Sequence, residues 1–329
     1  MGIEMIWTID WDAGEEECIA ATARHIFGNV GVFHAENLEP VWHMPVDFSS
    51  VQASMLYVAD VSGDSREEVV VYDANDAKIK IYWNGDSNPD PGPDKWDDPL
   101  YRRLKQVWNY YSPGSYTRRD PLILSLKIYL EGAYDALAHS MRTDLNPDLI
   151  PLASPFTQDL RVVTAVPEDA VDWVLVQLRA TTTGPAVISR SAFIRNDGRV
   201  IMEDGSTGLH LFAEKGSYYV VIRHRNHLAV MSSLVVDLNS GSGDFDFSTS
   251  GSQFYGTAGG NLLENGVWGM VAGETNDSGI VTNADKDEII SHLNYTGYYS
   301  ADCNLSGIVT HADKEPVIIN LNRSSQTGD

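Results

Sequence analysis

A twelve-residue pattern occurs twice near the end of this 329-residue sequence. The first copy, Glu274–Asp285, reads ETNDSGIVTNAD, and the second, Asp302–Asp313, reads DCNLSGIVTHAD. In both copies, oxygen-bearing side chains occupy positions 1, 3, 5, 9 and 12, and glycine occupies position 6. A hard cation needs this layout, because alternating oxygens converge on it, the glycine permits a sharp turn and the position-7 carbonyl adds a ligand. The sequence therefore predicts a pair of calcium-binding loops.

The predicted ligands come from equivalent positions of the two loops. They are Glu274, Asn276, Ser278, the carbonyl of Ile280 and Asp285, then Asp302, Asn304, Ser306, the carbonyl of Ile308 and Asp313. Because each set holds only two carboxylates, we expect modest affinity. A short apolar helix is expected after each loop, over residues 285–293 and 313–321. In the alternative interpretation, Asp285 and Asp313 only cap these helices after polar turns.

The spacing and the duplicated loop-then-helix order resemble dockerin-type calcium repeats. Loops of that family run Asp-x-Asn-x-Asp-Gly and close with Asp, which Asp285 and Asp313 match. Glu274 departs from the pattern at position 1, and Ser278 and Ser306 depart from it at position 5. The resemblance implies Ca²⁺ as the bound ion and a cohesin-like or cell-surface protein as the partner.

The formal net charge of −23 argues against nucleic acid and anionic membranes as partners. It suits a protein that binds divalent cations or works outside the cell. No apolar run is long enough to span a bilayer. Residues 1–17 lack the cationic start and apolar stretch of a signal peptide. The two cysteines, Cys18 and Cys303, support neither a disulfide framework nor a cysteine zinc site.

Residues 1–116 alternate apolar and polar side chains in short runs separated by turn residues. This pattern predicts an antiparallel β region without a notable helix, with strands near 4–10, 17–22, 29–35, 40–46, 54–61, 67–74 and 78–84. Two acidic, glycine-containing turns suggest a second kind of metal site, through Asp10, Asp12, Asp60, Asp64 and Glu68. Ordinary solvated turns are the alternative.

Two segments of this region, residues 59–72 (ADVSGDSREEVVVY) and 97–116, resemble the end of a rhamnogalacturonan lyase of polysaccharide lyase family 11. The match includes Ala59, Asp60, Gly63, Asp64, Arg66, Glu67, Glu68 and Val69, then Ile81, Tyr82, Asp98, Pro99, Tyr101, Arg102, Trp108 and Tyr111. Ser65 departs from it, since the family usually has Trp there. The resemblance implies an eight-bladed propeller and β-elimination on the pectin backbone. The groups available for that chemistry are Arg102, Arg103, Lys105, Tyr110 and Tyr111, with Trp108 as a sugar-stacking surface. Alternatively, the aromatic residues are blade core and the arginines are solvated.

A propeller needs at least about four blades, whereas 116 residues make two or three. We therefore expect the chain not to cleave polysaccharide alone and to be the C-terminal portion of a longer secreted polysaccharide-degrading protein. Its expected location is extracellular or at the cell surface, and its expected glycan partner is an acidic polysaccharide such as that of the plant cell wall. The competing interpretation is a non-enzymatic attachment or assembly protein.

Residues 117–250 contain about seven strand-like runs with turn signals at 196–198, 203–205 and 215–216, which is typical of a β-sandwich. A basic group there, Arg223, His224, Arg225 and His227, could meet a carboxylate of a uronic acid or of the chain itself. Residues 251–272 are expected to be a linker whose Val267-Trp268 patch docks against the calcium pair, and residues 273–325 the repeat module. The predicted fold is thus mainly β: partial propeller blades, a β-sandwich and a small helical calcium-binding pair.

Overall fold

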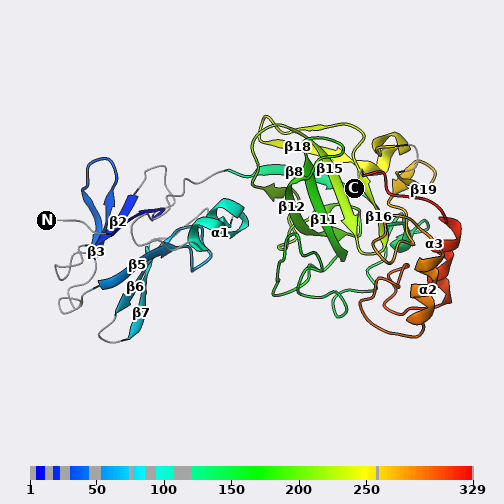
Figure 1. Cartoon of the computed structure of the whole chain (residues 1–329), viewed down its shortest axis with the longest axis horizontal. Helices are drawn as coiled ribbons and strands as arrows, with labels where there is room; N and C mark the ends of the chain where they lie inside the picture. The colour runs from blue at the N-terminus through cyan, green and yellow to red at the C-terminus, as the bar shows by residue number, and fades with distance from the viewer. Residues whose placement is uncertain are drawn as a thin grey trace. The chain divides into compact units, whose positions relative to one another are not determined.

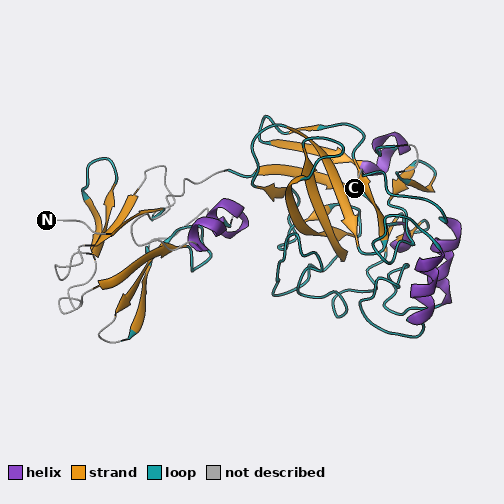
Figure 2. Ribbon diagram, in the orientation of Figure 1, coloured by secondary structure: helices purple, strands orange, loops and turns teal. Residues whose placement is uncertain are grey.

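A computed structural model of the chain describes residues 5–11, 18–22, 30–43, 53–73, 77–85, 94–106, 120–256 and 259–327. Over these ranges the protein is mainly β, with three α-helices (Figures 1 and 2). It divides into two compact units, Met1–Asp120 and Pro121–Asp329. Within the described ranges, no helix is long and apolar enough to cross a membrane.

The first unit contains two antiparallel sheets in which each strand pairs with its neighbour in the chain, in the orders β1-β2-β3-β4 and β5-β6-β7. The strands are β1 (Met5–Ile9), β2 (Cys18–Thr22), β3 (Val30–His34), β4 (Pro40–His43), β5 (Ala53–Ala59), β6 (Glu68–Asp73) and β7 (Lys78–Tyr82). All seven predicted strands are present, because alternating side chains leave one face of each sheet apolar. The two sheets share one core, in which Trp7 and Ile9 of β1 cluster with Val58 of β5 and Val71 of β6.

A helix follows these sheets, and here the sequence prediction of an all-β region is wrong. After the 3-10 helix η2 (Lys95–Asp97) comes α1 (Pro99–Gln106). The Asp98 side chain accepts a hydrogen bond from the Leu100 amide at 2.8 Å, which satisfies a free N–H at the start of the helix. Tyr101 and Lys105 lie one turn apart and are both buried, so one face of α1 packs on the unit. The described strands form no closed propeller, and the rhamnogalacturonan lyase fold is not supported.

The second unit is built on a β-sandwich. Its larger sheet has the order β13-β12-β11-β15-β16, with β17 also paired to β15, and its smaller sheet has the order β14-β8-β18. The strands are β8 (Leu122–Lys127), β11 (Ala170–Arg179), β12 (Ala186–Arg195), β13 (Val200–Ile201), β14 (Leu209–Leu211), β15 (Ser217–His224), β16 (His227–Met231), β17 (Val236–Asp237) and β18 (Ser242–Asp246). The β8–β18 pairing is parallel, and the other pairings are antiparallel.

One core lies between the two sheets. Leu122, Leu124 and Leu126 alternate along β8 and point into it, while all ten residues of β11 are buried, so both faces of that strand are covered. Trp173 of β11 packs on Phe193 of β12 with ring centroids 3.8 Å apart. The predicted turns at 196–198 and 203–205 are present, with glycine at φ 86° and 83°.

The connections contain further short elements. They are the 3-10 helices η3 (Glu131–Ala133), η4 (Phe247–Thr249) and η5 (Gly251–Gln253), the pair β9 (Tyr134–Asp135) and β10 (Ser140–Met141), and the hairpin β19 (Asn261–Glu264) and β20 (Val267–Gly269). The segment 251–272, expected to be a linker, therefore has structure of its own. Val267 and Trp268, which were expected to dock against the repeat module, pack against the sandwich core.

The end of the chain forms a helical pair. A helix follows each predicted loop, namely α2 (Asn283–Ser291) after the first, and η6 (His311–Asp313) continued by α3 (Lys314–Ile319) after the second. Ile289 of α2 and Val317 of α3 share a small core with Leu228 of β16 and Val271. The helical pair is thus packed onto the sandwich, within the same compact unit.

Candidate calcium-binding site

The two predicted loops have the same backbone shape. Position 4 is left-handed in both, at Asp277 and Leu305 with φ 56°. Position 6 is left-handed as well, with φ 76° at Gly279 and 83° at Gly307. A non-glycine residue rarely adopts this conformation, so its recurrence shows that the repeated sequence specifies one loop geometry.

Within each loop, the side chains of positions 1 and 3 converge on one backbone amide. The Ser278 amide donates to Glu274 Oε1 at 2.7 Å and to Asn276 Oδ1 at 3.0 Å. The Ser306 amide donates to Asp302 Oδ1 and to Asn304 Oδ1, both at 3.0 Å. The oxygens of the first two predicted side-chain ligands therefore point into the same small space.

The closing aspartates complete both the loops and the helix starts. Asp285 accepts hydrogen bonds from the Thr282 amide at 2.8 Å and from the Thr275 amide at 2.7 Å. Asp313 accepts them from the Thr310 amide at 2.7 Å and from the Asn304 amide at 3.0 Å.

The helix-cap alternative is partly realised. Thr282 and Thr310 are the N-caps, and Asp285 and Asp313, three residues later, complete a capping box in each helix. One carboxylate oxygen of each aspartate accepts the hydrogen bond from its N-cap threonine. The other oxygen accepts a hydrogen bond from an amide near the start of the same loop.

The four loop carboxylates, on Glu274, Asp285, Asp302 and Asp313, are each at most 4 % exposed. Within the described chain, none of them forms an ion pair. Burial raises the pKa of Glu274, and the charge of Asp285 raises it further. Burial likewise raises the pKa of Asp302 to about 6, and Asp313 adds to the effect, while the nearby Arg225 charge opposes it only in part. Each loop therefore contains two buried carboxylates that repel one another, and a bound cation would supply the missing countercharge.

The position-5 serines leave the ligand set short of carboxylates. Ser278 Oγ donates to the Ile280 carbonyl at 3.0 Å, and Ser306 Oγ donates to the Ile308 carbonyl at 3.2 Å. In each of these hydrogen bonds, the serine hydroxyl oxygen and the isoleucine carbonyl oxygen keep a free lone pair for a cation. Hard oxygen donors of this kind fit Ca²⁺. The described residues contain no cluster of three or more Asp, Glu, His or Cys side chains placed for a metal, so each loop would rely on two carboxylates plus amide, hydroxyl and carbonyl oxygens.

The acidic turns of the first unit are differently arranged. Asp60 accepts hydrogen bonds from the amides of Gly63 at 2.7 Å and Ser65 at 3.2 Å. Glu68 Oε2 accepts a hydrogen bond from the Val61 amide at 2.6 Å. Asp64 pairs with Arg66, Asp10 pairs with Lys95 at 2.7 Å, and Asp12 lies outside the described residues. Asp10 and Asp64 thus have ion-pair partners, whereas Asp60 and Glu68 accept hydrogen bonds, as the loop carboxylates do.

The residues implied by the lyase resemblance are only partly described. Arg102 lies on α1, whereas Trp108, Tyr110 and Tyr111 fall outside the described ranges. Lys105 is buried, with its Nζ 2.7 Å from both Glu67 Oε1 and the Val58 carbonyl. Burial raises the pKa of Glu67, but Lys105 and Lys95 outweigh this and hold that pKa below its ordinary value. Lys105 is therefore part of the packing of the first unit.

The basic group of the sandwich meets a carboxylate of the chain itself. Asp172 on β11 is fully buried and accepts hydrogen bonds from Arg225 Nε at 2.9 Å and Tyr298 OH at 2.6 Å, and it contacts His224 Nε2 at 3.1 Å. Burial would raise the pKa of Asp172, but Arg225 and His224 hold it below its ordinary value. Sequence reasoning identified the basic group but missed Asp172.

Further contacts join the second loop to the sandwich. Asn226 Nδ2 donates to the Asp302 carbonyl at 2.6 Å, and Arg142 Nη2 donates to the Asn304 carbonyl at 2.8 Å. At Gly132 the two backbones are so close that a Cβ would lie 1.9 Å from the Cys303 carbonyl oxygen. The calcium-loop candidate is therefore bound to the sandwich by its main chain.

Neither a protein-family model nor a curated protein matches this sequence. Two solved structures of type II Cohesin-X-Dockerin complexes from Acetivibrio cellulolyticus are similar to it. The match to an N-terminal interface mutant has 14 % identity and a TM-score of 0.35, and covers 62 % of this chain and 97 % of that chain. The match to a C-terminal interface mutant has 16 % identity, a TM-score of 0.34 and the same coverage. At these TM-scores, the likeness establishes no relationship of fold or function.

Proposed function

We propose that this chain is a non-catalytic attachment protein whose terminal repeat binds two calcium ions and docks a protein partner. The observation that carries the proposal is the pair of buried, mutually repelling carboxylates in each loop, none of which forms an ion pair within the described residues. Calcium would be held by Glu274, Asn276, Ser278 and Asp285, and by the equivalent positions of the second loop. The ion would neutralise the carboxylates and hold each loop against its helix.

The surface of the helical pair supports a protein partner. Its helices expose Ile290, Ile318 and Ile319, the last two by 64 % and 66 %. Exposed apolar side chains gathered on one small module favour contact with another protein. A cohesin-like protein is the partner class implied by the dockerin resemblance of the repeat.

The ligand count and the charge of the chain are consistent with work outside the cell. Loops with few carboxylates bind Ca²⁺ with dissociation constants of about 10⁻⁴ to 10⁻³ M, which is the range of extracellular modules. The net charge of −23 suits the same setting. We place the protein at the cell surface or in the extracellular space. We do not propose rhamnogalacturonan cleavage, because Lys105 is committed to a buried ion pair and no described residue gathers with it into an open catalytic site.

Calorimetric titration of calcium into the metal-stripped full chain tests the metal assignment. The wild-type chain should bind two ions, and the double variant Asp285→Asn/Asp313→Asn should lose the binding heat. Asp287→Asn is the matched control, because Asp287 is an exposed carboxylate on α2 outside the ligand set. Unchanged heats in the double variant would show that the loops bind no calcium.

Binding to a panel of immobilised cohesin-type domains, with calcium and then with EDTA, tests the docking role. The chain should be retained only with calcium, and Ile318→Glu/Ile319→Glu should abolish retention. Leu234→Glu, at an exposed apolar position of the sandwich, should leave it intact. Retention that survives both EDTA and the isoleucine changes would place docking elsewhere, and no retention by any domain would reject this partner class.

A further inference from the structure

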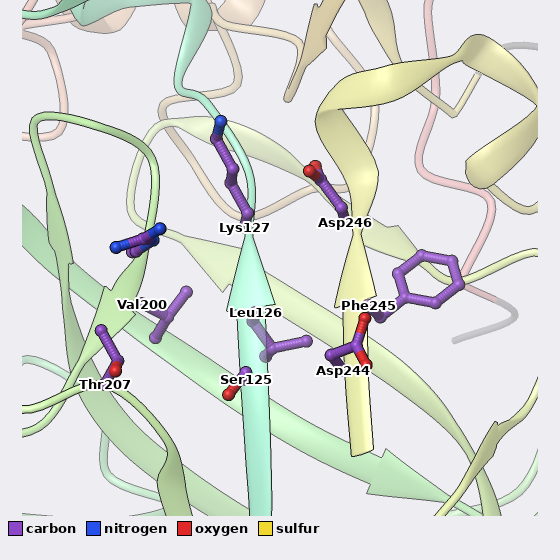
Figure 3. Close-up of a pocket in the computed structure, with 9 residues that line it drawn as sticks. Ser125, Leu126, Lys127, Val200, Thr207, Asp244, Phe245 and Asp246 are labelled. Carbon is purple, nitrogen blue, oxygen red and sulfur yellow. The ribbon is translucent and has the colours of Figure 1, made fainter.

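A cavity of about 440 Å³ lies beside the smaller sheet of the sandwich, remote in sequence from the calcium loops (Figure 3). Its polar lining comes from β8, β18 and the residues flanking β13, namely Ser125, Lys127, Arg199, Thr207, Asp244 and Asp246. We propose that this cavity binds a sugar acid, as a short oligosaccharide carrying carboxylate groups.

The strand register places two polar pairs side by side. β8 and β18 run parallel, with Ser125 opposite Asp244 and Lys127 opposite Asp246. Because side chains two residues apart lie on the same face of a strand, these four groups share one face of the sheet. Figure 3 shows Lys127 and Asp246 at adjacent ends of the two strands, with Ser125 and Asp244 further along them.

The opposite charges of the cavity do not neutralise one another. Lys127 and Asp246 occupy paired positions, yet no ion pair joins them within the described chain. Instead, the Lys127 ammonium lies 5.3 Å from the centroid of the Tyr129 ring. Asp246 Oδ1 accepts hydrogen bonds from the Ser248 amide and hydroxyl, which fixes the carboxylate and leaves Oδ2 for a ligand. Lys127 can therefore bind an external anion while Asp246 accepts from external hydroxyl groups.

The other two charged side chains, on Arg199 and Asp244, are exposed to solvent. Arg199 has a side chain 59 % exposed, and its nearest carboxylate, on Asp197, is 3.9 Å away. The Asp244 side chain has no hydrogen-bond or ion-pair partner in the described parts of the chain. The cavity thus offers two cations, two carboxylates and the hydroxyls of Ser125 and Thr207.

A sugar acid matches this mixture in chemistry and size. Its carboxylate would pair with Lys127 or Arg199, and its hydroxyls would donate to Asp244 and Asp246. The apolar lining residues Leu126, Val200 and Phe245 pack in or against the sandwich core, so the polar and charged groups make the contacts to the sugar. Small-molecule sites span about 300 to 1,000 Å³, so this cavity is suited to a ligand of one or two sugar rings and is roomy for a free amino acid.

Saturation-transfer NMR on the full chain at low ionic strength tests the proposal, with digalacturonate as probe and galactobiose as its neutral counterpart. Digalacturonate should bind with a dissociation constant of about 1 mM, and galactobiose at least about tenfold more weakly, since it lacks the charge-assisted contact. Lys127→Gln should weaken digalacturonate binding about tenfold and leave galactobiose binding unchanged. Lys215→Gln removes one exposed positive charge outside the cavity and should change neither.

Asp244→Asn separates the hydroxyl contacts from the charge contacts. It replaces an exposed carboxylate by its isosteric amide, so the fold is retained, and it should weaken both disaccharides. The proposal is overturned if digalacturonate gives no saturation transfer, if it binds no better than galactobiose, or if Lys127→Gln behaves as wild type. Preferential binding of the dipeptide Lys-Glu, lost in Lys127→Gln, would identify a peptide site and also overturn it.

Discussion

The buried carboxylate of Asp172 gives the sharpest test of how the second unit is held together. Its Oδ2 receives Arg225 Nε and lies beside His224, while its Oδ1 receives the Tyr298 hydroxyl and the Trp173 amide. The Arg225 guanidinium also lies 4.2 Å from the centroid of the Tyr298 ring. Asp172→Asn keeps the shape of this side chain but removes the countercharge of Arg225.

The expected loss of folding stability follows from the burial of Asp172 and Arg225. Asp172 is fully buried and Arg225 nearly so, with a side chain 8 % exposed. Removing one partner of a buried ion pair costs about 3 to 5 kcal/mol, because the remaining charge stays buried without compensation. A domain of this kind has a free energy of unfolding of about 5 to 15 kcal/mol, so the variant would lose a large share of it. Tyr298→Phe removes one hydrogen bond to the same carboxylate and should cost about 1.5 to 3 kcal/mol.

Hydrogen exchange read peptide by peptide measures this effect locally. In Asp172→Asn, amides of β11 and β15 should exchange faster by the factor that corresponds to the lost free energy. Amides of β5 and β6, in the other compact unit, should keep the wild-type rates and serve as an internal control. Either of two results would refute the assignment of Arg225 and Asp172 as a stabilising pair. In the first, Asp172→Asn lowers the protection of β11 by less than about 1 kcal/mol. In the second, it lowers that protection no more than Tyr298→Phe does.

Three further outcomes follow from the same structure. Burial lowers the folded-state pKa of His224 and His227, so the stability that depends on their neutral forms is complete above about pH 6.5 and is lost as the pH falls. The free energy of unfolding, measured by urea titration between pH 7.5 and 5, should drop by up to about 1.4 kcal/mol per pH unit per histidine, and by less in His227→Gln. Gly132→Ala should lower the free energy of unfolding by about 1 to 3 kcal/mol and increase proteolysis at residues 302–313, because its Cβ would overlap the Cys303 carbonyl. Gly85→Ala adds a Cβ in open space and should change neither quantity. Ser278→Asp/Ser306→Asp adds the position-5 carboxylate to both loops and should tighten calcium binding about tenfold or more by calorimetry; equal or weaker affinity would contradict the ligand assignment.

Local patterns in the sequence predicted the local structure of the chain well. The alternation of apolar and polar residues located the strands of both units, because it decides which face of a strand can be buried. The repeated pattern likewise located two loops of equal backbone shape, since Gly279 and Gly307 allow the same turn. Helix α1 was missed because its apolar face consists of little more than Tyr101 and the stem of Lys105, which is too short a pattern to identify a helix.

Long-range partners could not be predicted from these patterns. The basic group of residues 223–227 was evident, but its countercharge at Asp172 lies 53 residues from Arg225 in the sequence. The close approach of Gly132 to Cys303 joins positions even further apart. Such pairings are set by how the sheets and helices pack, and no local spacing indicates them. The resemblance to a lyase likewise identified a strand-turn-strand unit, whereas the described strands form no closed propeller.

The contacts between sandwich and repeat give the two calcium-loop candidates different surroundings. In the second loop, the carbonyls of Asp302 and Asn304 accept side-chain hydrogen bonds from Asn226 and Arg142, and the carbonyl between them, on Cys303, lies against Gly132. Three consecutive residues that begin the loop are thus fixed by the sandwich before any ion binds. A site whose ligands are already ordered loses less conformational entropy on binding, so the second loop should bind calcium more tightly than its carboxylate count alone implies. Calcium in that loop would in turn stabilise the sandwich, because the same backbone segment belongs to both. The sandwich therefore acts as the rigid support of the repeat, and a repeat excised at residue 273 should bind the ion in its second loop less tightly than the full chain does.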